Sequence, residues 1–266
     1  MRPYFGITDF TSIEEVRAME VVMRAYRPTP DHMLHVGVMM SRKSLHGEPT
    51  RWAAAWLKNE AIKDVLSDDR VYNCLHYADF AEEQDAHLAL SLAKAMSYGG
   101  PKLHGLQLDM VWPYPPDVIR AKAIARKVID ISPEIILQLG GKALDRMHND
   151  PVMVTGMLAE YGEGIDRVLL DRSGGMGVPL DASALLPFCE EIMLRLPRLG
   201  ITVAGGLSAE TMHLMGPIWK EFPNISIDAQ GALRPSRNAM DPIDWGLAEA
   251  YLRAACEENT KYQLAA

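Results

Sequence analysis

Short apolar segments rich in β-branched residues alternate along the chain with longer segments whose apolar residues recur every three or four positions. The first pattern predicts buried strands and the second predicts amphipathic helices. Clusters of glycine and proline separate the segments and mark the turns between them. The pattern predicts eight strands, at residues 4–8, 34–40, 71–77, 104–110, 134–139, 167–171, 201–204 and 224–228.

A helix is expected after each strand. The first begins at Thr11 or Ser12, either of which can cap its N-terminus, and acidic residues follow in its first turn. The segment 82–96 is rich in Ala, Leu and Glu, which favour helices. The other helices are expected from about residue 51, at 117–127, 151–161 and 181–196, after a cap at Ser208, and at 242–257.

Repeated strand–helix units predict parallel strands joined by right-handed crossovers, and eight such units close into a (β/α)₈ barrel, also called a TIM barrel. The length of 266 residues suits one barrel domain that spans residues 1–266. The alternative is an open doubly wound sheet, but its G-x-G-x-x-G motif does not follow the first strand. In a barrel, the active site is expected at the C-terminal ends of the strands.

Charge and composition narrow the partners and the location. The net charge of -8 argues against nucleic acids and anionic membranes, because binding either one requires a basic surface. Three cysteines without a C-x-x-C pair predict no disulfide framework, which fits a reducing compartment. With no apolar signal segment or membrane span, we expect a cytoplasmic protein. The scattered histidines predict no metal site, and no other cofactor is indicated.

Two glycine turns late in the chain indicate a phosphate site. They follow the seventh and eighth expected strands, at residues 204–208 and 228–234, which is where barrels commonly bind phosphate. Glycines let main-chain N–H groups approach an anion, and a helix beginning behind each turn would add a favourable dipole. As an alternative, the glycines only make tight turns. The predicted phosphate-binding residues are Gly205, Gly206, Gly231, Ala232 and Arg234.

Five short motifs lie along the chain: Phe5-Gly6-Ile7-Thr8, Val36-Gly37-Val38-Met39-Met40-Ser41-Arg42, Val168-Leu169-Leu170-Asp171 with Gly174-Gly175-Met176-Gly177, Ala204-Gly205-Gly206-Leu207 and Ile227-Asp228-Ala229-Gln230-Gly231. In content and order they resemble phosphoribosylanthranilate isomerase, a barrel enzyme of tryptophan biosynthesis. Residues between about 50 and 160 resemble that family poorly. The resemblance implies an isomerase-like enzyme whose substrate is a sugar phosphate or a phosphoribosyl compound.

The family rearranges a phosphoribosyl amine with a general acid and a general base, and the resemblance implies Asp171 as the acid. The family's catalytic cysteine is replaced by Phe5, which cannot transfer a proton, so we expect a reaction other than the family's own. The related isomerase of histidine biosynthesis uses two aspartates, so Asp109 or Asp9 is expected as the base. Structural alternatives are a helix cap or an ion pair for Asp171 and a hydrogen bond between strand ends for Asp109.

The resemblance also implies substrate contacts. Arg42 or Lys43 would hold a ligand carboxylate, and Gln107, Gly175 and Gly177 would line the substrate site. As an alternative, the two basic residues are solvated loop charges.

His76 lies at the end of the third strand. A structural role is preferred for it, and a place in the pocket wall is the alternative.

Two functions stay open: an isomerase or lyase of phosphorylated sugar compounds, and a non-catalytic barrel that binds a phosphorylated metabolite or a protein. A homodimer is also expected.

Overall fold

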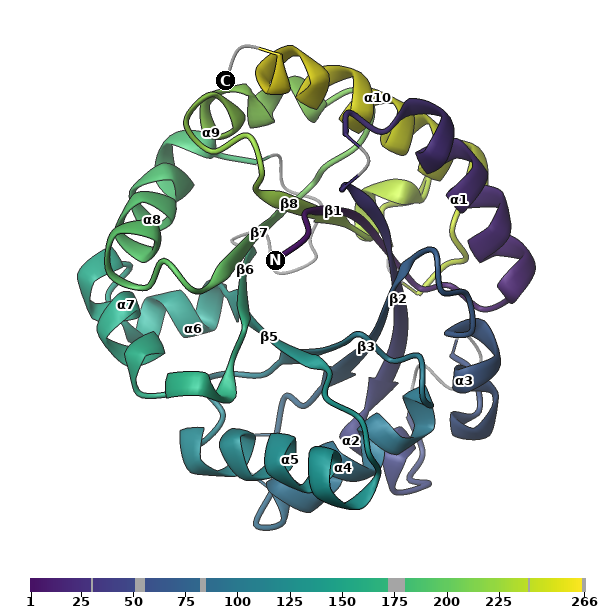
Figure 1. Ribbon diagram of the computed structural model, residues 1–266, viewed down its shortest axis with the longest axis vertical. Helices are drawn as coiled ribbons and strands as arrows, with labels where there is room; N and C mark the ends of the chain where they lie inside the picture. The colour runs from purple at the N-terminus through teal and green to yellow at the C-terminus, as the bar shows by residue number, and fades with distance from the viewer. Residues whose placement is uncertain (30, 51–55, 82–84, 172–179, 239, 265–266) are drawn as a thin grey trace.

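The computed structural model describes residues 1–29, 31–50, 56–81, 85–171, 180–238 and 240–264. Its eight strands are parallel, pair in sequence order, and close into a barrel where β1 pairs with β8 (Figure 1). The predicted TIM barrel is therefore confirmed. The strands are β1 (Tyr4–Thr8), β2 (Met33–Ser41), β3 (Tyr72–Ala78), β4 (Gly105–Asp109), β5 (Glu134–Gly140), β6 (Arg167–Asp171), β7 (Gly200–Ala204) and β8 (Ser226–Ala229).

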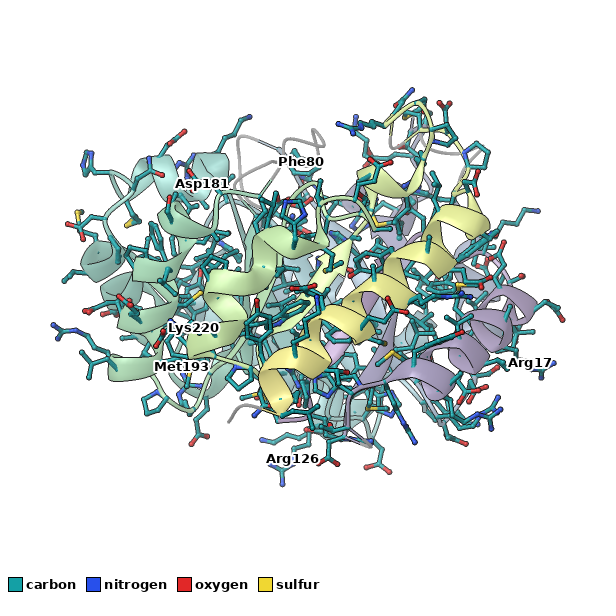
Figure 2. All side chains as sticks on the ribbon, turned by 90° about the horizontal axis from the view of Figure 1, so that it is seen from above. Arg17, Phe80, Arg126, Asp181, Met193 and Lys220 are labelled. Atoms are coloured by element: carbon teal, nitrogen blue, oxygen red, sulfur yellow. The ribbon has the colours of Figure 1, made fainter. Side chains whose placement is uncertain are left out.

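The helices surround the barrel, and the first and last of them lie side by side over the seam between β1 and β8 (Figures 1 and 2). Short 3₁₀ turns occur at η1 (Asn59–Ala61), η2 (Gly162–Gly164), η3 (Met212–Met215) and η4 (Gly231–Leu233). The helices are α1 (Ile13–Tyr26), α2 (Arg42–Leu45), α3 (Ile62–Val65), α4 (Leu88–Gly99), α5 (Pro115–Val128), α6 (Gly141–Arg146), α7 (Pro151–Ala159), α8 (Ala182–Arg195), α9 (Gly216–Glu221) and α10 (Trp245–Gln263).

Helix α1 begins where its capping sequence predicts. The Ser12 side chain accepts a hydrogen bond from the Glu15 main-chain N–H, and the Glu15 carboxylate accepts one from the Ser12 N–H. This reciprocal pair satisfies N–H groups that have no partner within the helix. Sequence alone was therefore sufficient at this terminus.

Two helices, α2 and α6, were not predicted. Helix α2 follows β2 directly, within the predicted loop at 41–49, and is capped by Ser41; the start of the helix predicted from about residue 51 lies outside the described residues. An additional helix, α6, begins at Gly141 behind an extended Gly140, so this glycine pair begins a helix as well as ending a strand. Both helices are short, with too little periodicity to be recognised in the sequence.

The prediction that a helix begins directly behind each glycine turn, with its dipole directed at the anion, is wrong. Ser208 does not cap a helix; its hydroxyl and that of Thr211 lie 3.2 Å apart within a turn, and η3 and then α9 follow. After β8, η4 is a single 3₁₀ turn, and α10 begins only at Trp245. In the turn after β7, the hydrogen bonds between Ser208 and Thr211 compete with helix formation.

Side chains of each strand alternate between the inside of the barrel and the layer beneath the helices. Inside, an apolar cluster that includes Tyr4, Ile136 and Leu169 fills the middle of the barrel. At the N-terminal end, Arg167 donates to Glu134 at 2.5 Å, and its guanidinium lies over the ring of Tyr4 at 5.1 Å. These side chains fill that end of the barrel, whereas polar groups gather at the other end.

No helix in the described part of the chain is long and apolar enough to cross a membrane.

Candidate active site

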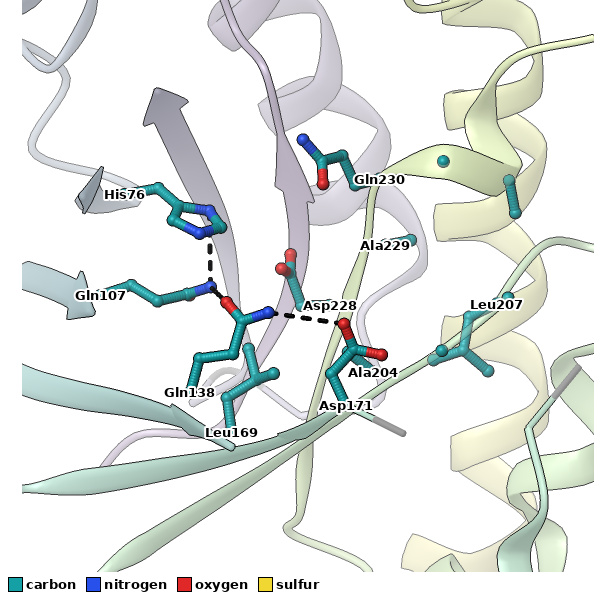
Figure 3. A pocket seen from close by; sticks show the side chains of 14 residues that line it. His76, Gln107, Gln138, Leu169, Asp171, Ala204, Leu207, Asp228, Ala229 and Gln230 are labelled. Carbon is teal, nitrogen blue, oxygen red and sulfur yellow. Dashed lines mark hydrogen bonds between the residues drawn. The ribbon is translucent and has the colours of Figure 1, made fainter. Parts of the chain in front are cut away.

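A narrow cavity of about 40 Å³ lies at the C-terminal ends of the strands, inside the barrel (Figure 3). By the volume that one water molecule needs, it holds roughly three waters or one small polar group. Strands β3 to β8 and the two glycine turns contribute to its wall. The lining residues are His76, Gln107, Gln138, Leu169, Asp171, Ala204, Gly205, Gly206, Leu207, Asp228, Ala229, Gln230, Gly231 and Ala232.

Four polar side chains on consecutive strands form a line across the cavity wall (Figure 3). The Gln107 amide nitrogen lies 3.5 Å from His76 Nδ1 and donates to Gln138 Oε1 at 3.0 Å. The Gln138 amide nitrogen in turn donates to Asp171 Oδ2 at 3.4 Å. A donor aimed at a carboxylate favours its charged form. The line therefore presents Asp171 to the cavity as a hydrogen-bonded carboxylate.

Asp228 occupies the space that a side chain on β1 would otherwise take. Gly6 lies opposite Asp228 in the register, and a Cβ atom on Gly6 would come within 2.4 Å of the Asp228 Oδ1 atom. Thr8 donates to the same carboxyl group at 3.2 Å. Burial raises the pKa of Asp228 to about 7, and the nearby charge of Asp171 adds to the increase. Asp228 therefore exchanges its proton near neutral pH.

His76 faces acidic groups from several strands. Burial acts to lower the pKa of His76, but Asp109, 3.8 Å from Nε2, together with Asp228 and Asp9, reverses this and raises it. His35 Nδ1 lies 3.9 Å from Asp228 Oδ1, and burial lowers the pKa of His35 to about 3. Of these two buried histidines, only His76 lines the cavity.

The predicted phosphate residues divide into two groups. Gly205, Gly206, Gly231 and Ala232 all line the cavity, and the two glycines after β7 have positive φ angles of 130° and 56°, which favour glycine. Arg234 lies outside the lining. It is buried and donates to Asp9 and to the main-chain oxygens of Gln230 and Asp241. Its contacts therefore do not support the predicted phosphate role.

The two candidate bases also lie outside the lining. Asp9 forms an ion pair with Arg234 and accepts a hydrogen bond from Gln230 at 3.0 Å. Asp109 contacts His76, and its side chain is 23% exposed. Both aspartates therefore already have structural partners, and the catalytic role predicted for them gains no geometric support.

The predicted substrate contacts are only partly brought together. Gln107 lines the cavity, as described above. Arg42, at the start of α2, lies 3.8 Å from Asp79, and neither Arg42 nor Lys43 is among the described lining residues. Gly175 and Gly177 lie outside the described residues.

Phe5, which the resemblance aligned with a catalytic cysteine, does not face the cavity. It is fully buried beneath the helices, where its ring lies 5.1 Å from that of His32 and 6.0 Å from that of Trp219. The inward-facing neighbours on β1 are Gly6 and Thr8, which contact Asp228. A proton-transferring side chain at position 5 would therefore face the layer beneath the helices and not the cavity.

Sequence reasoning did not assign a role to Asp228 or Gln138. One signal was present: each is a polar residue near the C-terminal end of its strand, as Gln107 and Asp171 are in theirs. Such a residue near a strand's C-terminal end is expected to face the active site of a barrel. Among the described residues, no group of three or more His, Cys, Asp or Glu side chains is arranged to hold a metal.

Comparisons with known proteins support the fold. No known family profile matches the sequence, and no curated protein sequence matches it. Among solved structures, that of KGPDC from Streptococcus mutans is similar, with a TM-score of 0.56 and 12% sequence identity over 99% of this chain and 100% of that one. At this identity, the similarity shows a shared TIM-barrel fold alone.

Proposed function

We propose that this TIM barrel is an enzyme that moves protons on a phosphorylated sugar or phosphoribosyl compound, in an isomerase- or lyase-type reaction. One observation carries the proposal: both glycine turns line the same cavity as two carboxyl groups, Asp171 and Asp228. The cavity thus combines a candidate anion site with an acid–base pair. The resemblance to phosphoribosylanthranilate isomerase supports the same class of substrate.

The surroundings of the two carboxyl groups suggest their roles. Asp171 accepts a hydrogen bond from Gln138, which favours its charged form, whereas burial holds the pKa of Asp228 at about 7. Two carboxyl groups in such different surroundings suit a general base and a general acid. We assign Asp171 as the base and Asp228 as the acid, the reverse of the role that the resemblance implies for Asp171.

In the proposed reaction, the Asp171 carboxylate removes a proton from a carbon next to a carbonyl or imine group. The Asp228 carboxylic acid gives its proton to the oxygen or nitrogen of that group. A bound phosphate would favour this arrangement, since its negative charge keeps Asp228 protonated. The phosphate would be held by main-chain N–H groups, because the described lining residues include no lysine or arginine.

Hydrogen–deuterium exchange tests the proposal before the true substrate is known. The protein is incubated in D₂O with a panel of aldose and ketose phosphates, and ¹H NMR follows the hydrogen on the carbon next to the carbonyl. Enzyme-dependent exchange with at least one compound, lost in both Asp171→Asn and Asp228→Asn, is expected. Exchange that persists in both variants would contradict the assigned acid–base pair.

The alternative function, a non-catalytic barrel that binds a phosphorylated metabolite, is favoured by the narrowness of the cavity, about 40 Å³. A phosphate group fits such a space, while a sugar would have to lie across its mouth. Binding of phosphate esters without exchange in any of them would support this alternative.

A further inference from the structure

The amide of Gln107 is placed between two acceptors. Its nitrogen faces both His76 Nδ1, at 3.5 Å, and Gln138 Oε1, at 3.0 Å, whereas its own oxygen is buried and has no hydrogen-bond partner. In this arrangement His76 Nδ1 acts as an acceptor, so the imidazole ring is neutral and its other nitrogen carries the proton. The same arrangement leaves Asp171 as a carboxylate that accepts from Gln138.

The charges around His76 favour its protonated form. Asp109 from β4, Asp228 from β8 and Asp9 after β1 all act on it in this direction, and together they outweigh burial and raise the pKa of His76. His35, on β2, adds no positive charge near these groups, because burial lowers its pKa to about 3 and keeps it neutral. A protonated imidazole has two donors and no acceptor, so it cannot accept the Gln107 amide hydrogen.

A second arrangement resolves this conflict. If the Gln107 amide makes a half-turn, its oxygen accepts from the protonated His76 Nδ1. Gln138 must then turn as well, so that its nitrogen donates to the Gln107 oxygen. The Gln138 oxygen now faces Asp171 Oδ2, and two oxygens at this distance repel unless Asp171 carries a proton that it can donate. The second arrangement thus binds two protons more than the first, one at His76 and one at Asp171.

We propose that Gln107 and Gln138 are positioning residues that couple the protonation of His76 to the protonation of Asp171. Turning only one glutamine would place two oxygens or two NH₂ groups face to face at the contact between them, so both glutamines turn together or not at all. The coupling deepens the proposed function, and its consequence for catalysis rests on that function. When Asp171 takes a proton from the substrate, the oxygen of the turned Gln138 accepts a hydrogen bond from the newly formed carboxylic acid. Gln107 and His76 complete the stabilisation of that state.

The coupling has a sign that direct charge interaction cannot produce. Through space, the Asp171 carboxylate attracts a proton to His76, so Asp171→Asn should lower the pKa of His76. Through the glutamines, the carboxylate opposes protonation of His76. An asparagine can offer Gln138 either its oxygen or its nitrogen, so Asp171→Asn should raise the pKa of His76. Asp171→Asn also removes a charge that raises the pKa of Asp228. Asp228 is then more fully ionised and attracts a proton to His76, so this effect has the same sign as the coupling through the glutamines.

A double-mutant cycle removes the contribution of Asp228. The pKa of His76 is measured by NMR titration of histidine-labelled protein, with the His76 resonance identified as the one that His76→Asn removes. The change caused by Asp171→Asn is compared in the natural background and in Gln138→Met, which has similar volume but no amide. Effects through space and through Asp228 are common to both backgrounds, so their difference measures the coupling through the glutamines.

The expected result is that Asp171→Asn raises the pKa of His76 by about 0.5–1 unit more in the natural background than in Gln138→Met, the size of one hydrogen bond. Equal changes in the two backgrounds, or a smaller increase in the natural one, would overturn the proposal. If Gln138→Met does not fold, Gln107→Met interrupts the same line and replaces it. The titration needs no substrate, so its outcome is independent of whether the proposed reaction occurs.

Discussion

Arg234 and Asp9 form a buried ion pair across the seam where the last strand of the barrel meets the first. Their side chains are only 2% and 11% exposed, and Arg234 also donates to the main-chain oxygens of Asp241 at 2.6 Å and Gln230 at 2.7 Å. Asp9 has a φ angle of 91°, which is uncommon for a residue with a side chain and persists where its surroundings hold it. The pair therefore ties the loop after β8 to the end of β1.

Arg234→Met should destabilise the protein markedly, because it leaves the Asp9 carboxylate buried without its charge partner. The expected loss is about 3–5 kcal/mol of the free energy of unfolding, or a decrease in Tm of roughly 10 °C for a chain of this size. Thermal unfolding followed by circular dichroism measures it. Arg195→Met is the matched control, since it breaks the Arg195–Glu191 pair, in which the arginine is 59% exposed, and should cost less than about 1 kcal/mol. Similar losses in the two variants would contradict a structural role for Arg234.

Asp228 should make stability depend on pH. Burial raises its pKa from an ordinary value of 3.8 to about 7, so the folded protein holds this proton more tightly than the unfolded chain does. The stability that this provides is fully present below about pH 4 and is lost as the pH rises through about 7. Asp228→Asn removes the titration. The free energy of unfolding of Asp228→Asn minus that of the natural protein, measured by chemical denaturation, should therefore increase between pH 4 and pH 7, by an amount on the order of a few kcal/mol. A difference that does not change with pH would show that Asp228 has an ordinary pKa.

Binding of phosphate esters should depend on the turn after β8. Gly231 lies in the 3₁₀ turn η4 and lines the cavity. Gly231→Asp places a negative charge there, so it should abolish the stabilisation by inorganic phosphate or glycerol phosphate. A ligand at 100 times its Kd stabilises by about 2.7 kcal/mol, which a thermal-shift assay detects. Gly231→Ala adds bulk without charge and should keep most of the effect. Unchanged binding by Gly231→Asp would place the phosphate elsewhere.

Asp171→Asn should stop hydrogen exchange or turnover with any active compound while binding changes little, because the amide cannot take up a proton but retains a similar shape. We expect at least a hundredfold loss, the usual contribution of general acid–base catalysis, about 10²–10⁴-fold. Asp109→Asn is the comparison: Asp109 contacts His76 and lies outside the described cavity lining. It should retain turnover with an altered pH profile. An active Asp171→Asn and an inactive Asp109→Asn would return the base role to Asp109.

The sequence predicted some elements of the site better than others, for physical reasons. Asp171, Gln107 and the glycine turns were predicted to lie in the site and all line the cavity, because they occur at strand ends or just beyond them, and strand ends meet at one face of a barrel. Asp228 was passed over because it appeared only as part of a glycine turn. Its importance depends on Gly6, 222 residues earlier in the chain, leaving room for its carboxyl group.

What the sequence determined by itself was the alternation of eight strands with helices and the turns between them. These follow from local patterns of apolar residues, caps and glycines, and parallel strands in this order close into a barrel. Only the tertiary structure decided which polar side chains share the cavity. Whether a side chain faces the inside of the barrel or the helices depends on how the neighbouring strands are aligned. Phe5 faces the helices, whereas Asp228 faces the cavity. The structure likewise decided that Arg234 binds Asp9, because a buried guanidinium requires a nearby carboxylate that only folding brings to it.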